Sequence, residues 1–355
     1  MEIAKRYLRQ VSLSEIGAAG QQKLRNAKVL VIGAGGLGCP VLQMLATSGV
    51  GTLGIVDGDM VEETNLHRQL LFSADDCGKS KVDVAADAIQ KLNPEVETHI
   101  YPYFIGESNI AGITKSYDIL VDCTDNIASR YLINDIAVFT KKPMAYASIH
   151  KFEGQVSVFN YKNGPTYRCL FPEKESSAVP NCVTSGVLGV LPNTLGMLQA
   201  SEVLKMILGI GKVLSGRVLI YDALEMCFNE LEFQKNDTQI EIAYQKGKAL
   251  TEGSNLNFEL DKTTFLEKCK DEKCLVIDLR EAHELPKLPF GSIVSIPFSR
   301  LAEHQSKIKK DQQIIVFCQS GLRSKKALEL LINNGFTNVQ HLQNGVQSLR
   351  LTATN

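Results

Sequence analysis

A glycine-rich turn between a buried strand and a helix is the feature that most constrains the fold of this chain. Residues 28–32 (KVLVI) form an apolar run, and Gly33-x-Gly35-x-x-Gly38 follows at once and opens a helical segment. Glycines at this spacing permit a tight turn, and the N-terminus of the helix presents free N–H groups to a phosphate. Asp57 ends the next predicted strand, where a carboxylate can accept hydrogen bonds from ribose hydroxyls. The pattern predicts a nucleotide-binding domain.

Strands and helices alternate along most of the chain, which is typical of a mostly parallel sheet with helices on both faces. We therefore predict a Rossmann-like, doubly wound α/β domain over residues 1–235. Residues 234–257 are polar and lack a clear apolar period, so 236–257 is predicted to be a linker, a flexible coil able to span on the order of 25 Å. A second, smaller α/β domain is predicted over 258–355.

Composition and charge exclude several classes of protein. The 38 Lys and Arg residues against 39 Asp and Glu leave a net charge of −1, which argues against nucleic-acid or anionic-membrane partners. The nine cysteines include no C-x-x-C pair, and no secretory segment precedes the first strand, so a reducing cytoplasm is expected. The longest apolar stretch, 187–210, is interrupted by polar residues and predicts a buried amphipathic helix rather than a membrane span.

The side chains that follow the glycine-rich turn argue against hydride transfer. A dinucleotide needs little side-chain charge, whereas a triphosphate with a leaving pyrophosphate needs several cations, and Arg68 and Lys81 are placed to supply them. Asp125 follows another predicted strand and could hold Mg²⁺ against phosphate oxygens. His67 is interpreted as structural or substrate-orienting. An NAD-dependent oxidoreductase stays open as the alternative function.

Six motifs in a fixed order resemble the MoeB/ThiF family of ubiquitin-activating-type adenylyltransferases, over residues 1–233. They are Arg6-Tyr7-x-Arg9-Gln10, Gly33-x-Gly35-Gly36-x-Gly38, Asp57-x-Asp59, Asn65-x-x-Arg68-Gln69, Lys81 and Asp122-Cys-Thr-Asp125-Asn126. The resemblance implies that the protein uses ATP and Mg²⁺ to adenylate the C-terminal Gly-Gly carboxylate of a ubiquitin-like sulfur carrier. A carboxylate attacking the α-phosphorus needs positioning and charge neutralisation rather than a protein base.

The resemblance also assigns roles to individual residues. The residues expected at the nucleotide are Gly33, Gly35, Gly36, Gly38, Asp57, Asp59, Asn65, Arg68, Lys81, Asp125 and Asn126. Among these, Arg68 and Lys81 would contact the phosphates and Asp125 would hold Mg²⁺. Arg9 would reach the nucleotide site of a neighbouring subunit, which implies a homodimer.

Two cysteines sit where the resemblance predicts special roles. The family has two C-x-x-C pairs that bind structural zinc, but the first pair here keeps only Cys169 and nothing resembling the second is present. One thiolate cannot make a four-ligand site, so no zinc is expected. Cys182 occupies a position at which the family can form a covalent link to the carrier, and a plain loop cysteine is the alternative. Cys39 and Cys123 are predicted to be packing residues.

The second domain carries a cysteine at a strand-to-helix junction. Cys318 follows an apolar strand and precedes Gly321-Leu322-Arg323-Ser324, so backbone N–H groups, a helix N-terminus and Arg323 would surround its sulfur and favour a sulfur anion. A tyrosine-phosphatase loop fits less well, because its arginine would fall at Ser324. Over residues 258–350 the chain resembles the rhodanese family, which implies that Cys318 carries a persulfide stabilised by Arg323.

The two resemblances together predict one pathway of sulfur activation. The first domain would form an acyl-adenylate on the carrier, and the Cys318 persulfide would convert it to a thiocarboxylate. The sulfur donor is expected to be a cysteine desulfurase or thiosulfate, and the carrier could serve molybdopterin or thiamine synthesis. A non-catalytic scaffold that only docks a ubiquitin-like protein is the third hypothesis.

Overall fold

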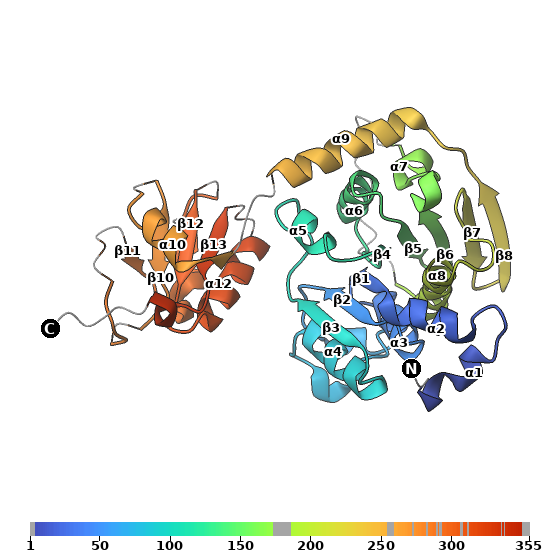
Figure 1. The fold of residues 1–355 in the computed structure, drawn as a ribbon, viewed down its shortest axis with the longest axis horizontal. Helices are drawn as coiled ribbons and strands as arrows, with labels where there is room; N and C mark the ends of the chain where they lie inside the picture. Colours follow the sequence, from blue (N-terminus) through green and yellow to red (C-terminus); the bar gives the residue numbers. More distant parts are fainter. Residues whose placement is uncertain are drawn as a thin grey trace. The chain divides into compact units, whose positions relative to one another are not determined.

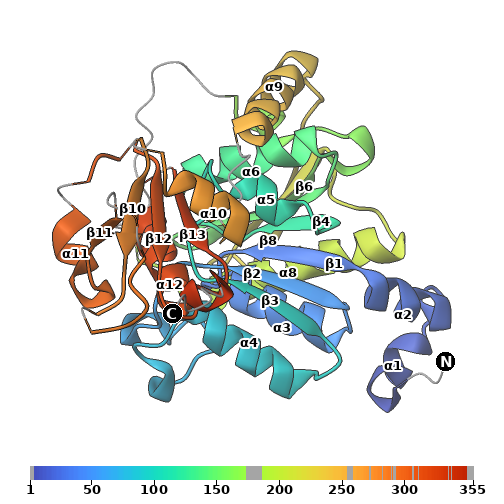
Figure 2. The same ribbon diagram turned by 60° about the vertical axis from the view of Figure 1, so that its left-hand side comes forward.

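The computed structural model divides the chain into two compact units, Met1–Glu252 and Gly253–Asn355. It describes residues 4–172, 186–253, 259–271, 273–281, 283–288, 290, 293–305, 308–310, 312–334, 336 and 338–349. Figures 1 and 2 show the elements of each unit in two views. None of the described helices is both long and apolar enough to cross a membrane.

The described part of the first unit is built on one mixed sheet in the order β3-β2-β1-β4-β5-β6-β7-β8. Its strands are β1 (Lys28–Ile32), β2 (Thr52–Val56), β3 (Glu97–Tyr101), β4 (Ile119–Asp122), β5 (Met144–His150), β6 (Glu153–Phe159), β7 (Arg217–Asp222) and β8 (Cys227–Glu232). The strands from β3 through β5 are parallel, and β6, β7 and β8 continue the sheet antiparallel. The predicted doubly wound, mostly parallel sheet is confirmed.

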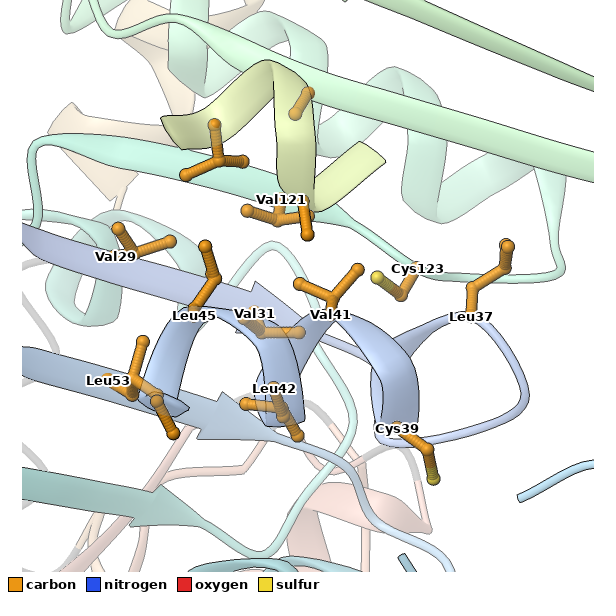
Figure 3. Packing of buried hydrophobic residues seen from close by; sticks show 14 of the residues in the cluster. Val29, Val31, Leu37, Cys39, Val41, Leu42, Leu45, Leu53, Val121 and Cys123 are labelled. Atoms are coloured by element: carbon orange, nitrogen blue, oxygen red, sulfur yellow. The ribbon is translucent and has the colours of Figure 1, made fainter. Parts of the chain in front are cut away.

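Helices cover both faces of this sheet (Figure 1). They are α1 (Leu8–Val11), α2 (Gly17–Asn26), α3 (Gly38–Thr47), α4 (Lys81–Leu92), α5 (Ile110–Thr114), α6 (Ile127–Phe139), α7 (Tyr167–Leu170), α8 (Val190–Leu208) and α9 (Asp237–Gly253). Alternate residues of β1 enter different cores: Val29 and Val31 pack with α3 and α8, whereas Leu30 and Ile32 pack on the side of α6. Figure 3 shows the α3 side of this packing. A central parallel strand is buried on both faces, which explains its unbroken apolar run.

The predicted linker is wrong over most of its length, because residues 237–253 form helix α9. All but the last residue of this helix belong to the first unit. Ala243 is fully buried, and the Tyr244 ring lies 5.3 Å from that of Phe139 on α6. A Cβ at Gly247 would come within 2.2 Å of the Asp135 carbonyl oxygen. The face of α9 turned to α6 therefore has the helical period, but Ala243 and Gly247, which make two of its closest contacts, weaken the apolar signal in the sequence.

A buried ion pair joins α6 to α7. Arg168 Nε and Nη2 donate to Asp135 Oδ1 and Oδ2 at 2.6 and 2.7 Å, and both side chains are almost fully buried. Arg168→Met should lower the free energy of unfolding of the first unit by about 3–5 kcal/mol, because it leaves a buried carboxylate without its cation. Urea denaturation measures the loss.

Two companion variants make that measurement specific. Lys79→Met breaks an exposed pair with Asp76 and should cost less than about 1 kcal/mol. Adding Asp135→Asn to Arg168→Met should restore part of the stability, since the unpaired charge is removed. Equal losses in Arg168→Met and Lys79→Met would contradict the structural role of the buried pair.

The second unit has its own parallel sheet, in the order β11-β10-β12-β13-β9. Its described elements are β9 (Glu259–Leu260), α10 (Lys262–Lys268), β10 (Leu275–Asp278), β11 (Ile293–Ser295), α11 (Leu301–His304), β12 (Ile314–Phe317), α12 (Leu322–Asn333) and β13 (Val339–Leu342). The central strand β12 is buried on both faces, as β1 is in the first unit. This confirms the second, smaller α/β fold.

Candidate functional site

A cavity of about 590 Å³ lies at the carboxyl ends of β1, β2, β4 and β5. Ligands of open parallel sheets bind where the strand order reverses, here on either side of β1. The cavity wall brings together most of the residues predicted to bind the nucleotide: Gly33, Gly35, Gly36, Asp57, Asp59, Asn65, Arg68, Lys81, Asp125 and Asn126. These residues come from five separate segments of the sequence, so the fold is what assembles them.

The glycine-rich turn leaves no room for side chains at two positions. Gly33 has φ +99°, and a Cβ there would come within 2.7 Å of the Cys123 carbonyl oxygen. A Cβ at Gly38 would come within 2.0 Å of the Gly33 carbonyl oxygen, so Gly38 closes the turn from behind rather than lining the cavity. The turn therefore places the N-terminus of α3 next to the cavity, where its free N–H groups can bind a phosphate.

Asp57 fixes the turn from the neighbouring strand. Its Oδ2 accepts a hydrogen bond from Ala34 N at 2.7 Å, and its Oδ1 accepts one from Asp59 N at 2.9 Å. Burial raises the pKa of this carboxyl, although Lys81 and these two N–H groups act in the opposite direction. Each carboxylate oxygen can accept a second hydrogen bond. Asp57 can thus hold the turn and still accept a ribose hydroxyl.

The two predicted phosphate-binding cations both face the cavity but differ in their partners. Lys81 begins α4, is 5% exposed, and its Nζ lies 2.9 Å from Asp59 Oδ2. Arg68 donates from Nη1 to the Thr64 carbonyl oxygen at 2.9 Å. Because a guanidinium has five N–H donors, Arg68 keeps further donors for a ligand.

Two charged residues that sequence reasoning did not assign support the Asp125 loop. Asp122 is fully buried, and its Oδ1 accepts hydrogen bonds from Thr124 N at 2.9 Å and Thr124 Oγ1 at 2.7 Å. Arg130 donates from Nη2 to the Thr124 carbonyl oxygen at 3.2 Å, and its guanidinium lies 5.5 Å from the centre of the Tyr146 ring. Hydrogen bonds to Asp122 and from Arg130 therefore fix Thr124, the residue directly before Asp125. In the sequence, Asp122 was visible only as the first residue of the Asp122-Cys-Thr-Asp125-Asn126 motif, and Arg130 only by its position one turn into α6.

Asp122 is also electrostatically unusual. Burial raises the pKa of its carboxyl, while the charge of Arg130 opposes that rise. Within the described residues its Oδ2 and the Arg130 Nε are buried without a hydrogen-bond partner. An unsatisfied buried acceptor is costly, and such groups concentrate at functional sites.

Several predicted residues lie elsewhere. Arg9 is exposed on α1 and does not line the cavity of its own chain, and neither does His67. Cys182 falls outside the described residues. Burial raises the pKa of the Cys39 thiol to about 12 and that of Cys123 well above its usual value, so both are packing residues as predicted.

Cys169, at the position of a zinc-binding cysteine in the family but predicted here to bind no zinc, takes part in a set of hydrogen bonds. Its Sγ accepts from Asn236 N at 3.3 Å and from Thr166 N at 3.4 Å. The sulfur thus connects α7 to the residue before α9. No group of three or more potential ligands suited to a metal ion occurs in the described parts of the chain.

The second unit places Cys318 directly after β12, as the sequence predicted. Its Sγ is buried and accepts hydrogen bonds from Gly321 N at 3.2 Å and Ser324 N at 3.3 Å. Gly321 has φ +91° and caps α12, so the loop wraps its N–H groups around the sulfur. Such a ring of donors stabilises an anion, and it would hold the terminal sulfur of a persulfide equally well.

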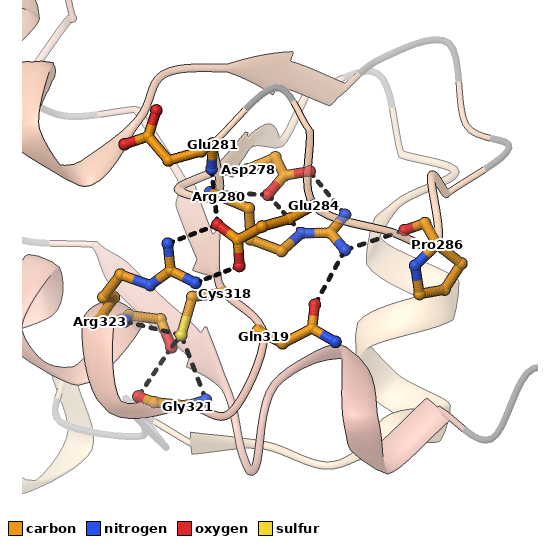
Figure 4. Close-up of polar contacts among 10 residues, drawn as sticks. Asp278, Arg280, Glu281, Glu284, Pro286, Cys318, Gln319, Gly321 and Arg323 are labelled. Atoms are coloured by element: carbon orange, nitrogen blue, oxygen red, sulfur yellow. Dashed lines mark hydrogen bonds and ion pairs between the residues drawn. The ribbon is translucent and has the colours of Figure 1, made fainter.

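Arg323, predicted to stabilise a persulfide on Cys318, is itself paired with a carboxylate. Its Nη1 and Nη2 donate to Glu284 Oε2 and Oε1 at 2.7 and 2.5 Å. This bidentate pair lies above the sulfur in Figure 4. Arg280 is likewise paired with Asp278, and it also donates to Gln319 Oε1 in the cysteine loop at 3.3 Å. Glu284 lies 39 residues before its partner, so no local motif could reveal the pair.

The fold and the two sites define a class of protein: a nucleotide-binding α/β unit joined to a unit that presents a cysteine in an anion-binding loop. Residues 7–275 match the ThiF family, and residues 261–351 match the Rhodanese-like domain family. The chain belongs to the ThiF family and carries a C-terminal rhodanese-like domain. It is an adenylyltransferase with sulfurtransferase activity, and it uses ATP.

Three known proteins illustrate the similarity. A "Probable adenylyltransferase/sulfurtransferase MoeZ" of Mycobacterium tuberculosis is 37% identical over 362 residues, covering 97% of this chain and 92% of the relative. A "Sulfur carrier protein adenylyltransferase" of Thermus thermophilus is 48% identical over 237 residues, covering 65% of this chain and 88% of the relative. The crystal structure of E. coli MccB with ATP has a TM-score of 0.58 and 26% identity, covering 66% of this chain and 73% of MccB.

Proposed function

We propose that this enzyme adenylates the C-terminal Gly-Gly carboxylate of a ubiquitin-like sulfur carrier and then converts the acyl-adenylate to a thiocarboxylate with sulfur from Cys318. The observation that carries the first step is the convergence of the glycine-rich turn, Asp57, Arg68, Lys81 and Asp125 on one cavity. The name of the Thermus thermophilus relative, "Sulfur carrier protein adenylyltransferase", supports the choice of a sulfur carrier as the substrate.

The chemistry of the cavity suits adenylyl transfer. Attack of a carboxylate on the α-phosphorus releases pyrophosphate, and negative charge grows on the leaving group. Arg68 and Lys81 would neutralise that charge, and the N–H groups at the start of α3 would hold phosphate oxygens. Hydride transfer would require neither cation, which favours adenylyl transfer over an NAD-dependent reaction.

Magnesium fits the donors at the β4 end of the cavity. Mg²⁺ prefers carboxylate and phosphate oxygens and is usually held by one or two carboxylates. The Asp125 carboxylate is exposed to the cavity, next to the loop that Asp122 and Arg130 fix. When bound, the metal would screen phosphate charge. We propose that Asp125 is its ligand, with Asn126 bound instead to Ser129 N as the cap of α6.

Arg130→Lys tests whether the support of the Asp125 loop matters. The substitution keeps the charge but loses the planar contact with Tyr146 and the bond to Thr124. Because residues behind a metal ligand typically tune affinity, the Mg²⁺ concentration for half-maximal ATP–pyrophosphate exchange should rise about tenfold. Arg6→Lys is the matched control, since Arg6 also donates to a backbone carbonyl, that of Leu92, but lies outside the cavity wall. An unchanged magnesium requirement in Arg130→Lys would refute this role.

The second step follows from the cysteine loop. The terminal sulfur of a Cys318 persulfide would attack the carbonyl carbon of the acyl-adenylate, and AMP would leave. The resulting acyl disulfide links the carrier to Cys318, and a thiol must reduce its S–S bond to release the thiocarboxylate. The N–H groups of Gly321 and Ser324 would stabilise the sulfur anion at each stage.

The same proposal includes a homodimer and a covalent bond between Cys182 and the carrier. Arg9 is exposed on α1 and is therefore available to a nucleotide site other than its own. Cys182 could form a covalent bond to the carrier, and a Cys182→Ala variant that still converts the carrier would leave that bond dispensable. A carrier of molybdopterin synthesis is favoured by a further relative, a "Probable molybdopterin-synthase adenylyltransferase" of Gracilaria tenuistipitata var. liui that is 37% identical over 332 residues. A thiamine carrier is the alternative.

Carrier-dependent ATP–pyrophosphate exchange tests the proposal directly. Purified enzyme, ATP, Mg²⁺ and labelled pyrophosphate should give exchange only when a carrier ending in Gly-Gly is added. A carrier that lacks its last glycine is the control, because it removes the carboxylate from its required position. No exchange with molybdopterin-type or thiamine-type carriers would overturn the proposed function.

A further inference from the structure

We infer that His341 takes the thiol proton of Cys318 through the hydroxyl of Ser324, so that a thiolate and an imidazolium form together inside the second unit. The inference rests on the proposed sulfur-carrying role of Cys318, and it adds the route by which the proton leaves the sulfur. The thiolate is the form of a cysteine that attacks sulfur. His341 acts through Ser324 and is therefore a positioning residue.

Three buried side chains are connected through the Ser324 hydroxyl. Cys318 follows β12, Ser324 lies in the first turn of α12, and His341 lies on β13. Their exposed fractions are 0%, 0% and 4%. The distance from Cys318 Sγ to Ser324 Oγ is 3.6 Å, and the distance from Ser324 Oγ to His341 Nδ1 is 3.3 Å. The hydroxyl is thus within hydrogen-bond distance of both the thiol and the imidazole.

The Ser324 hydroxyl can both accept and donate a proton, as a relay requires. A hydroxyl has one proton and can accept two hydrogen bonds. Its proton can go to the Gly321 carbonyl oxygen, 3.0 Å away, or to His341 Nδ1. In either case its oxygen can accept a hydrogen bond from the Cys318 thiol. Rotation of the hydroxyl from the carbonyl to the imidazole therefore completes the path from the sulfur to His341.

The proton transfer balances within the chain. The Cys318 S–H bond breaks and its proton goes to Ser324 Oγ, while the Ser324 O–H bond breaks and its proton goes to His341 Nδ1. The products are a thiolate, a neutral hydroxyl and an imidazolium, so the total charge does not change. The N–H groups of Gly321 and Ser324, 3.2 and 3.3 Å from the sulfur, then stabilise the thiolate.

The charges around the cysteine loop explain why an internal proton acceptor is useful. Cys318 has no exposed surface, so loss of its proton to solvent would leave a buried negative charge, which is costly. Arg323, the basic residue of the loop, is already paired with both oxygens of Glu284 (Figure 4). An imidazolium at His341 supplies the positive charge that offsets the thiolate.

The elements packed against β13 place other groups beside His341. Its register partner on β12 is Val316, which is apolar and fully buried. Its register partner on β9 is Glu259, an acidic residue. From α12 it is contacted by Ser324, and Arg323, the residue before Ser324, is already in an ion pair. Glu259 is therefore the acidic position from which the role of His341 has to be distinguished.

A difference titration of the full-length enzyme tests the relay. The ultraviolet absorbance of thiolate is recorded against pH for each enzyme and for its Cys318→Ser derivative, and the difference reports Cys318 alone. His341→Asn keeps a hydrogen-bonding group near the position of Nδ1 but cannot take a proton. It should move the appearance of the thiolate to higher pH by about one pH unit, which lowers the thiolate signal at neutral pH about tenfold.

Ser324→Ala should have the same effect as His341→Asn. It removes the hydroxyl between the two groups but keeps the backbone N–H that contacts the sulfur. The double variant should be no more impaired than either single variant, because residues that act as a unit are not additive. The same shift should appear in the pH profile of thiocarboxylate formation, which a merely structural role of His341 would not move.

Two matched controls make the result specific. His304→Asn removes an imidazole of the same unit that lies 2.9 Å from the Arg300 carbonyl oxygen, and Glu259→Gln removes the acidic register partner. Both should keep the wild-type titration. A wild-type titration in His341→Asn, or an equal shift in Glu259→Gln, would overturn the relay and leave the sulfur-carrying role of Cys318 intact. Failure of the wild type to form thiocarboxylate would overturn the proposed function. Thermal unfolding of each variant shows that it is folded.

Discussion

Asp125→Ala should lower carrier-dependent ATP–pyrophosphate exchange by about 10²–10³-fold, a loss expected when one electrostatic contact to a charged transition state is removed. The loss should fall mainly on kcat. Negative charge grows on pyrophosphate as it leaves, so a carboxylate that holds the cation screening this charge acts more on the transition state than on bound ATP. Initial rates at several carrier and ATP concentrations separate kcat from KM.

The prediction for Asp125 has a matched control on the same unit. Asp87 is an exposed carboxylate on α4 and is not part of the cavity wall, so Asp87→Ala should retain full exchange. Asp125→Ala should also leave sulfur loading of Cys318 intact, because that step uses the second unit. Near-normal exchange in Asp125→Ala would remove Asp125 from the proposed machinery, whereas equal losses in both variants would indicate a general effect of lost charge.

The parts of the molecule that could be predicted from the sequence are those in which neighbours along the chain determine the geometry. In the turn, Gly38 packs against the Gly33 carbonyl oxygen within six residues, and in the cysteine loop Ser324 N donates to Cys318 Sγ within seven. Parallel strands then bring their carboxyl ends to one edge, which explains why residues from five segments share one cavity.

The parts that could not be predicted depend on contacts distant in sequence or on small residues. Helix α9 packs through Ala243 and Gly247, which have little apolar signal, so its segment resembled a linker. The partner of Arg323 is 39 residues away, and only the fold shows that its charge is compensated. Arg130 had a helical position but no recognisable motif, and its contact with Thr124 depends on the loop after β4.

Cys318→Ser should abolish thiocarboxylate formation, by more than about 10⁴-fold, while leaving ATP–pyrophosphate exchange at the wild-type level. The serine hydroxyl can accept hydrogen bonds from the N–H groups of Gly321 and Ser324, so the loop should fold as in the wild type. The serine cannot carry a transferable sulfur, however, and the enzyme should stop at the acyl-adenylate. Mass spectrometry of the carrier distinguishes the adenylate from the thiocarboxylate.

The matched control for this variant is an exposed cysteine of the first unit. Cys227→Ser removes a thiol on β8, which should change neither exchange nor thiocarboxylate formation. Supplying free sulfide to Cys318→Ser should restore some thiocarboxylate, because sulfide can attack the adenylate without the loop. Thiocarboxylate formed by Cys318→Ser with a persulfide donor alone would mean that sulfur reaches the carrier by another cysteine. In that case the eight other cysteines of the chain would have to be replaced in turn to find it.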